Sequence, residues 1–309
     1  MTDPQQADFA PGRRVPLRAI VGSLRRGAGD PTWIEGPDGI WRGSITPHGP
    51  VSLGLRVERA VSGDRVVATA HGPGAPWVLE RLPRLLGADD TIGEFVAHHD
   101  VVAEALAAQR DWRLGRTDLV IDALVPAIIE QRVTGRQAFS AYRTLVRRYG
   151  AIAPGPAGQR GLRTPPSAAQ WLRVPSWEWL RAGVDAQRAD TVMRALRVAA
   201  RLEECVDLPA QEASRRLRTV PGIGVWTAAE VAQRAFGDPD AVSFGDYHVA
   251  KNIGYALTGQ PVDDAGLAQL LEPYAGHRYR VQYLVHAAGL SRPRRGPRLS
   301  LPTHLPARF

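Results

Sequence analysis

Residues 217–229 read Leu-Arg-Thr-Val-Pro-Gly-Ile-Gly-Val-Trp-Thr-Ala-Ala. Apolar residues at helical spacing lie on both sides of this segment, so one helix is predicted to end near Thr219 and another to begin near Val225. Pro221 and the glycines that flank Ile223 predict a tight turn, because glycine adopts backbone conformations that other residues avoid. The segment therefore predicts a helical hairpin with a short loop, in which Ile223 points inward.

The predicted hairpin loop suits an anion. The first N–H groups of a helix have no partner within the helix, and the helix dipole adds positive potential there. A bare Gly-X-Gly loop would favour an ordinary linker between two helices, but the full Val-Pro-Gly-Ile-Gly-x-x-Thr-Ala string favours a DNA phosphate as the partner. The predicted contacts with the DNA backbone are Pro221, Gly222, Ile223, Gly224 and Thr227.

A second informative segment follows the hairpin. Residues 236–248 read Phe-Gly-Asp-Pro-Asp-Ala-Val-Ser-Phe-Gly-Asp-Tyr-His, and Asp246 lies 20 residues after Trp226. An Asp at the start of a helix often serves as its N-cap, and the same carboxylate can stay ionised for chemistry. The neighbouring Asp238 and Asp240 lie between glycine and proline, so we expect them to shape the turn.

Together the hairpin and the following Asp resemble the helix-hairpin-helix DNA glycosylase superfamily. The order of sheet and helices upstream resembles its 3-methyladenine DNA glycosylase II branch, and the similarity spans roughly residues 33–290. The resemblance implies an enzyme of base excision repair that extrudes a damaged base from double-stranded DNA, and the base that it implies is an alkylated purine. It also implies that Asp246 stabilises the oxocarbenium-like transition state of N-glycosidic bond hydrolysis.

Residue 226 separates two mechanisms within that superfamily. Members that also cut the DNA strand carry a nucleophilic lysine at this position, whereas this chain carries Trp226 and has Lys251 as its only lysine. The resemblance therefore implies a monofunctional enzyme. Trp226 and Tyr247 are the expected walls of the base pocket, because an aromatic face stacks well on an electron-poor alkylated base. An ordinary buried aromatic is the alternative for both residues.

An enzyme that extrudes a base must fill the gap in the base stack. Residues 129–135, Ile-Glu-Gln-Arg-Val-Thr-Gly, end an apolar run and resemble the wedge-bearing turn of the family. Arg132 is the wedge by position, and Gln131 could share that role. An arginine departs from the apolar wedge common in the alkylpurine branch, and a solvated helix face is the alternative interpretation.

Cofactor chemistry is limited by the single cysteine, Cys205. One cysteine excludes an internal disulfide and a cysteine-ligated zinc or iron–sulfur cluster, so no cofactor is expected. The hairpin of the family often binds a monovalent cation. The resemblance therefore implies a structural Na⁺ or K⁺ at the main-chain carbonyls of Arg218, Val220 and Ile223.

The charge of the chain favours a polyanionic partner. The net charge is +8, and Lys251 is the only lysine among the 39 basic residues, which leaves 38 arginines. Arginine grips phosphate bidentately, although codon usage in a GC-rich genome would explain the arginine bias equally well. No apolar run approaches the roughly 18–20 residues of a membrane span, and the N-terminus does not resemble a secretory signal. We expect a cytoplasmic, nucleoid-associated monomer.

The expected fold is mainly α, a helical glycosylase module with a small N-terminal antiparallel α+β domain. We expect a flexible leader (1–30), the sheet domain (31–90), the helical module (91–290, with the hairpin at 217–229) and a basic Pro/Arg-rich tail (291–309). The helices expected from apolar periodicity are 77–86, 91–108, 118–149, 166–172, 176–182, 185–204, 208–219, 225–236, 246–257, 264–271 and 278–289.

Two other functions stay open at this point. The chain could be a glycosylase for an oxidised, deaminated or crosslinked base. It could also be a non-catalytic protein that uses the hairpin only to bind DNA. The position of Asp246 argues against the second, because a pure binding module gains nothing from a carboxylate close to phosphates.

Overall fold

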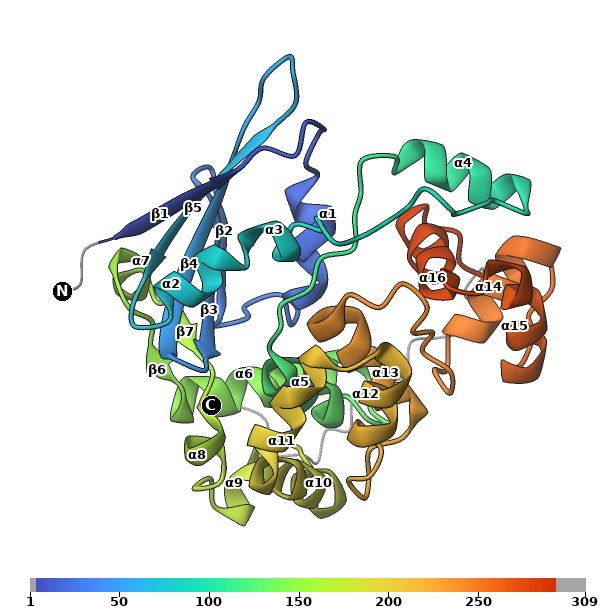
Figure 1. Cartoon of the computed structure of the whole chain (residues 1–309). Helices are drawn as coiled ribbons and strands as arrows, with labels where there is room; N and C mark the ends of the chain where they lie inside the picture. Colours follow the sequence, from blue (N-terminus) through green and yellow to red (C-terminus); the bar gives the residue numbers. More distant parts are fainter. Residues whose placement is uncertain (1–3, 293–309) are drawn as a thin grey trace.

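The computed structural model describes residues 4–292 (Figure 1). Of the predicted basic tail (291–309), residues 291 and 292 are described, and the rest lies outside the described residues. Within the described residues, five strands form an antiparallel sheet in the order β1-β5-β4-β3-β2. A short pair, β6 and β7, lies beside it (Figure 1). The strands are β1 (Gln5–Phe9), β2 (Trp33–Gly36), β3 (Gly39–Thr46), β4 (Gly49–Glu58), β5 (Arg65–His71), β6 (Ala151–Ile152) and β7 (Arg163–Thr164).

The interpretation of residues 1–30 as a flexible leader is wrong for the described residues. Strand β1 pairs with β5 from Gln5 opposite Ala70 to Phe9 opposite Val66. Helix α1 (Leu17–Val21) then buries its apolar side chains against the sheet core. The strand was not predicted because the segment is rich in Arg, Gly and Pro and because its partner strand lies far away in the sequence.

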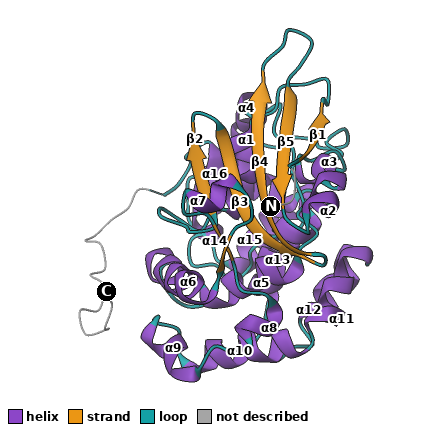
Figure 2. Ribbon diagram, turned by 90° about the vertical axis from the view of Figure 1, so that its left-hand side faces the viewer, coloured by secondary structure: helices purple, strands orange, loops and turns teal. Residues whose placement is uncertain are grey.

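The rest of the described chain is mostly helical, which confirms the expected fold class (Figure 2). The helices are α2 (Ala75–Glu80), α3 (Leu82–Leu85), α4 (Asp100–Ala108), α5 (Val120–Ile129), α6 (Gly135–Tyr149), α7 (Pro156–Gln159), α8 (Ala168–Trp171), α9 (Ser176–Arg181), α10 (Ala186–Arg197), α11 (Ala199–Glu203), α12 (Ala210–Leu217), α13 (Val225–Val231), α14 (Val249–Thr258), α15 (Asp264–Leu271) and α16 (Arg278–Ala287). None of the described helices is long and apolar enough to cross a membrane.

Three large apolar cores hold these elements together. The first surrounds α5, whose Leu124, Ile128 and Ile129 are fully buried, and includes α6 and α10 to α13. The second lies between the sheet and helices α1 to α3. The third joins α4 to α14, α15 and α16, which lie side by side in Figure 1 although the sequence separates them. The site-bearing helix α13 packs directly against the buried α5.

Several predicted helices are shorter or divided. Residues 91–99 are not helical, and helix 118–149 is interrupted by a turn at residues 130–134. Thr134 explains the restart, because its hydroxyl accepts the Gln137 N–H at 3.3 Å while the Gln137 side chain accepts the Thr134 N–H at 3.0 Å. Gly150 and Gly237 occupy the C-cap positions of two helical segments.

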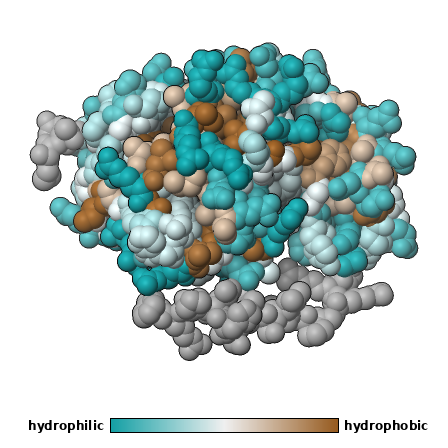
Figure 3. Space-filling view, turned by 90° about the horizontal axis from the view of Figure 1, so that it is seen from below, coloured by the Kyte–Doolittle hydropathy of each residue, from teal (hydrophilic) through white to brown (hydrophobic). Residues whose placement is uncertain are grey.

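The surface seen from the side of α9 and α10 mixes hydrophilic side chains with separate apolar patches (Figure 3). The large exposed apolar side chains among the described residues include Trp177 and Leu180 of α9. Isolated apolar side chains of this kind are common on soluble proteins, so we assign them no role.

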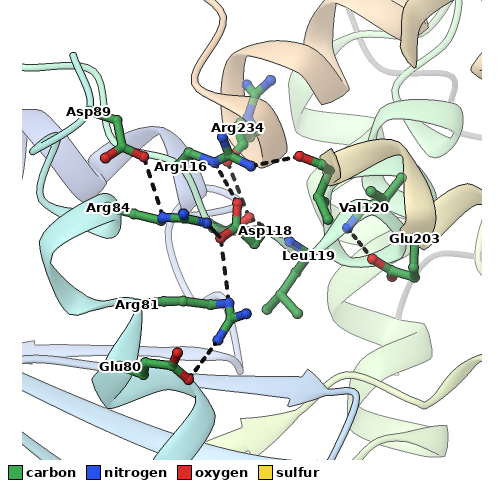
Figure 4. Close-up of polar contacts among 12 residues, drawn as sticks. Glu80, Arg81, Arg84, Asp89, Arg116, Asp118, Leu119, Val120, Glu203 and Arg234 are labelled. Atoms are coloured by element: carbon green, nitrogen blue, oxygen red, sulfur yellow. Dashed lines mark hydrogen bonds and ion pairs between the residues drawn. The ribbon is translucent and has the colours of Figure 1, made fainter. Parts of the chain in front are cut away.

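A buried carboxylate joins the helices beside the sheet to the helical module (Figure 4). Asp118 is 4% exposed, and its side chain pairs with Arg116, lies 3.5 Å from Arg81 Nε and lies 3.4 Å from Arg84 Nη1. Its backbone N–H donates to the Ala235 carbonyl at 3.1 Å. Asp118 also has a φ of +55°, a conformation that Asp and Asn tolerate better than most residues. This one side chain therefore holds three arginines at the start of α5.

We predict that Asp118→Asn lowers the free energy of unfolding by about 1–3 kcal/mol. Asn keeps the size and the left-handed backbone but removes the charge shared by three partly exposed guanidinium groups. Chemical denaturation of both proteins measures the effect. Asp190→Asn is the matched control, because the Asp190 side chain is 68% exposed and lies 4.0 Å from its arginine partner. Equal losses in the two variants would contradict the structural role of Asp118.

Candidate functional site

The predicted hairpin is present between α12 and α13. The Val220 carbonyl accepts the Ile223 N–H at 3.0 Å, and Gly222 has a φ of +98°. Pro at the second position and a left-handed Gly at the third are typical of a type II turn. Ile223 is only 5% exposed, which confirms that it points inward. The DNA contact that was also predicted for Ile223 does not fit this burial of its side chain.

The outer side of the turn is open to solvent. Pro221, Gly222 and Gly224 are exposed, and Gly224 occupies the N-cap position of α13 in an extended conformation. In residues 4–292, no acceptor is found for the backbone N–H groups of Gly224 and Val225. Free donors at this turn are the arrangement expected for contacts with a phosphate.

Two side chains brace the turn from neighbouring helices. Gln131 Nε2 donates to the Gly222 carbonyl at 3.0 Å and to Thr227 Oγ1 at 2.8 Å. Arg194 Nη1 of α10 donates to the Pro221 carbonyl at 3.2 Å. The shared wedge role predicted for Gln131 does not fit this position, because its amide is engaged on the hairpin. The DNA contact predicted for Thr227 does not fit either, since Thr227 is 2% exposed.

Arg132 lies at the tip of the turn between α5 and α6. Its side chain is exposed and its φ is +55°, a conformation that is uncommon and costly for arginine. The hydrogen bonds of the neighbouring Gln131 to the hairpin fix the base of this turn. The wedge role of Arg132 stays a prediction that its exposed position allows.

The structure brings Trp226 and Asp246 together. Trp226 Nε1 donates to Asp246 Oδ2 at 3.3 Å, and both residues are half-buried. Asp246 Oδ1 accepts the N–H groups of His248 at 2.7 Å and Val249 at 3.1 Å. Asp246 thus caps the start of α14, which begins at Val249 and not at Asp246 as expected.

Tyr247 directly follows Asp246 in the chain. It is 70% exposed, so the alternative of an ordinary buried aromatic does not describe it, and its role as a pocket wall stays a prediction. Lys251 Nζ lies 3.6 Å from the centroid of the Tyr247 ring, and the ring of His248 meets it edge-on at 4.9 Å. The single lysine of the chain is therefore stacked on Tyr247 and does not occupy the position of Trp226.

Asp238 and Asp240 shape the turn before the Asp246 loop (residues 242–248), as predicted. Asp238 Oδ1 accepts the Asp240 N–H at 2.8 Å. Asp240 Oδ1 accepts the N–H groups of Gly276 at 2.9 Å and Arg278 at 3.0 Å, which fixes the start of α16.

A polar cluster that was not predicted from the sequence lies beneath the Asp246 loop. Ser243 Oγ donates to Glu230 Oε1 at 2.6 Å, and Arg234 Nη1 donates to Glu230 Oε2 at 2.7 Å. Gln233 Nε2 donates to Ser243 Oγ at 2.9 Å, and Gln282 Oε1 accepts the Ser243 N–H at 3.1 Å. Only the spacing of Glu230, four residues after Trp226 on α13, was a usable signal, because such residues share a helix face.

The three main-chain carbonyls that were expected to bind a monovalent cation have free lone pairs with which to do so. Within the described residues, the carbonyls of Arg218 and Ile223 accept no hydrogen bond, and the Val220 carbonyl accepts only the Ile223 N–H. Carbonyl oxygens with free lone pairs are suitable ligands for Na⁺ or K⁺. The described residues contain no group of His, Cys, Asp and Glu that could hold a metal ion. The cation stays a prediction.

Comparisons of this chain with known proteins give one result for its sequence and another for its structure. No family model matches the sequence, and no curated protein sequence matches it. Solved structures do match. The 3-methyladenine DNA glycosylase of Archaeoglobus fulgidus superposes with a TM-score of 0.73 at 17% identity, over 92% of this chain and 98% of that chain. This chain has the helix-hairpin-helix glycosylase fold.

Other structures with this fold include enzymes for different lesions. The 8-oxoguanine glycosylase/lyase of Clostridium acetobutylicum, solved with double-stranded DNA, has a TM-score of 0.64 at 14% identity, over 88% of this chain and 91% of that chain. The 3-methyladenine DNA glycosylase of Schizosaccharomyces pombe, solved with abasic DNA, has a TM-score of 0.51 at 16% identity, over 63% and 94%. The glycosylase fold is thus shared between lesion classes.

We predict that Gly222→Ala lowers the free energy of unfolding, by about 1–3 kcal/mol from the backbone alone. Alanine does not favour a φ of +98°, and its Cβ would lie 2.3 Å from Thr191 Oγ1. Gly224→Ser is the control, because a Cβ there meets no atom within 4 Å and Ser is a good N-cap. Thermal or chemical denaturation measures both variants, and a stable Gly222→Ala protein would contradict the turn geometry.

Proposed function

We propose that this protein is a monofunctional DNA glycosylase of base excision repair. The proposal rests on the contact between Trp226, at the start of α13, and the carboxylate of Asp246. It sets an acidic group beside a turn whose free N–H groups suit a DNA phosphate. The glycosylase fold supports the same assignment.

In the proposed complex, duplex DNA lies across the hairpin and the turn that carries Arg132. Pro221, Gly222 and Gly224 contact the backbone, and Arg132 enters the base stack as the target base leaves it. The net charge of +8 favours this partner. We expect the protein to act as a cytoplasmic, nucleoid-associated monomer.

Asp246 supplies the proposed chemistry. When the N-glycosidic bond breaks, its electron pair leaves with the base and positive charge develops at C1′ of the deoxyribose. The ionised carboxylate stabilises that charge, and water then adds to C1′ and releases a proton to solvent, which leaves an abasic site. Hydrogen bonds from Trp226, His248 and Val249 hold the carboxylate in one orientation.

The proposed substrate class is alkylated purines of the 3-methyladenine and 7-methylguanine type. Trp226 supports it, because an indole face next to a carboxylate favours a base with positive charge. The fold is also found in an 8-oxoguanine glycosylase/lyase, so an oxidised, deaminated or crosslinked base is the alternative substrate. A non-catalytic DNA-binding protein is the alternative from another class, and its DNA binding would not depend on Asp246.

We predict that Asp246→Asn reduces base release from alkylated duplex DNA by about 100- to 1000-fold, because it removes the negative charge facing the transition state. Single-turnover release measures the rate, and a filter or fluorescence assay measures DNA affinity, which should persist. Asp263→Asn is the matched control, since Asp263 also caps a helix by accepting the Gly266 N–H at 2.9 Å. Equal release by wild type and Asp246→Asn would remove Asp246 from catalysis. No release from a full lesion panel would favour the DNA-binding alternative.

We also predict that borohydride traps no covalent enzyme–DNA adduct during base release. Trapping requires an amine that attacks C1′ to form a Schiff base. Trp226 cannot form one, and the ammonium of Lys251 is stacked on Tyr247. The abasic product should therefore stay uncut until alkali is added. An adduct that disappears in Lys251→Arg would instead show a lyase.

A further inference from the structure

We infer that Glu230 is a positioning residue that holds the Asp246 loop in place through Ser243, an inference that rests on the proposed glycosylase function. Trp226 and Glu230 lie four residues apart on α13 and therefore share one face of this helix. Trp226 bonds to Asp246 at one end of the loop, and Glu230 bonds to Ser243 at the other. The loop thus has two attachment points on one helix.

Ser243 is suited to be the inner attachment point. It is 1% exposed, and its hydroxyl donates to Glu230 Oε1 at 2.6 Å while it accepts from Gln233 at 2.9 Å and Gln282 at 3.1 Å. Its backbone N–H donates to the Gln282 side chain at 3.1 Å. A buried hydroxyl that makes all of these hydrogen bonds has a single low-energy orientation. The backbone at Ser243 is therefore fixed.

Glu230 is suited to be the anchor because its own position is fixed. It is 8% exposed and pairs with Arg234, whose Nε donates to the Ser23 carbonyl at 3.1 Å. Burial alone would raise the pKa of Glu230, but Arg234 and the Ser243 hydroxyl lower it further than burial raises it, so the pKa lies below its usual value. The ionised carboxylate makes a stronger hydrogen bond to Ser243 than a neutral group would.

The Asp246 loop has no regular secondary structure, so its position depends on contacts with neighbouring elements. Gly245, directly before Asp246, has a φ of +86°, and its N–H donates to Asp264 Oδ2 of α15 at 2.9 Å, which is a further tie of the loop outside α13. Catalytic groups must be held within about 0.5 Å of the productive geometry. A displacement of about 1 Å can cost about 100-fold in rate.

Ser243→Ala tests the link without unpairing Glu230 from Arg234. We expect single-turnover base release to fall about 10- to 100-fold while the Kd for DNA stays within about twofold, because the hairpin is unchanged. Ser52→Ala is the matched control. Ser52 is also fully buried and donates to the Pro154 carbonyl at 2.6 Å, but it belongs to the sheet.

Glu230→Gln provides a second variant, since it keeps the size of the side chain and loses the charge. If Glu230 acts through Ser243, the double variant Glu230→Gln/Ser243→Ala loses less than the product of the two single losses. The inference would be overturned if the loss of rate in the double variant equalled the product of the two single losses. A wild-type rate in Ser243→Ala would also overturn it.

Amide hydrogen exchange at His248 and Val249 gives a readout that does not need activity. These N–H groups donate to Asp246, so we expect about tenfold faster exchange in Ser243→Ala and no change in Ser52→Ala. If the wild type releases no base from any lesion, the proposed function fails, yet faster exchange would still support the positioning role. Unchanged exchange in Ser243→Ala would contradict that role by itself.

Discussion

The hydrogen bond from the Trp226 indole to Asp246 Oδ2 connects the two parts of the candidate site. One partner begins the helix after the hairpin, and the other lies on a loop without regular structure. The position of Trp226 is set by α13, which packs on the largely buried α5. Because a close-packed core resists deformation, the buried helix fixes the relative position of the turn and the carboxylate.

The arginine-rich composition serves the interior as well as the surface. Arg188 is 6% exposed, and its Nη1 donates to the Ile129 carbonyl at 2.6 Å, at the end of α5. Arg26 is 5% exposed and pairs with Glu130 at 3.1 Å, next to the turn that carries Arg132. A buried guanidinium is tolerated where carboxylates and carbonyls surround it. Net charge therefore overstates how many arginines are free for the proposed contact with DNA.

The parts of the fold that the sequence predicted are those with local signals. The Pro-Gly turn and the inward Ile223 both follow from residues within one turn of the chain. Strand β1 was missed because its pairing with β5 is between distant residues. The Ser243 cluster was missed for the same reason, since it needs α13, the Asp246 loop and α16 to meet. Glu230 resembles a surface charge in the sequence and is buried only by that tertiary contact.

The capping and catalytic interpretations of Asp246 are compatible because its two oxygens have different partners. Oδ1 accepts two backbone N–H groups at the start of α14, and among residues 4–292 only the Trp226 indole donates to Oδ2. A carboxylate oxygen has more than one lone pair, so Oδ2 keeps capacity for a developing positive charge or a water molecule. With three donors directed at it, the group acts as a preorganised negative charge, and no reorientation is needed at the moment of bond cleavage. In the proposed reaction, the hydrogen bonds between Asp246 and the start of α14 thus also orient the carboxylate.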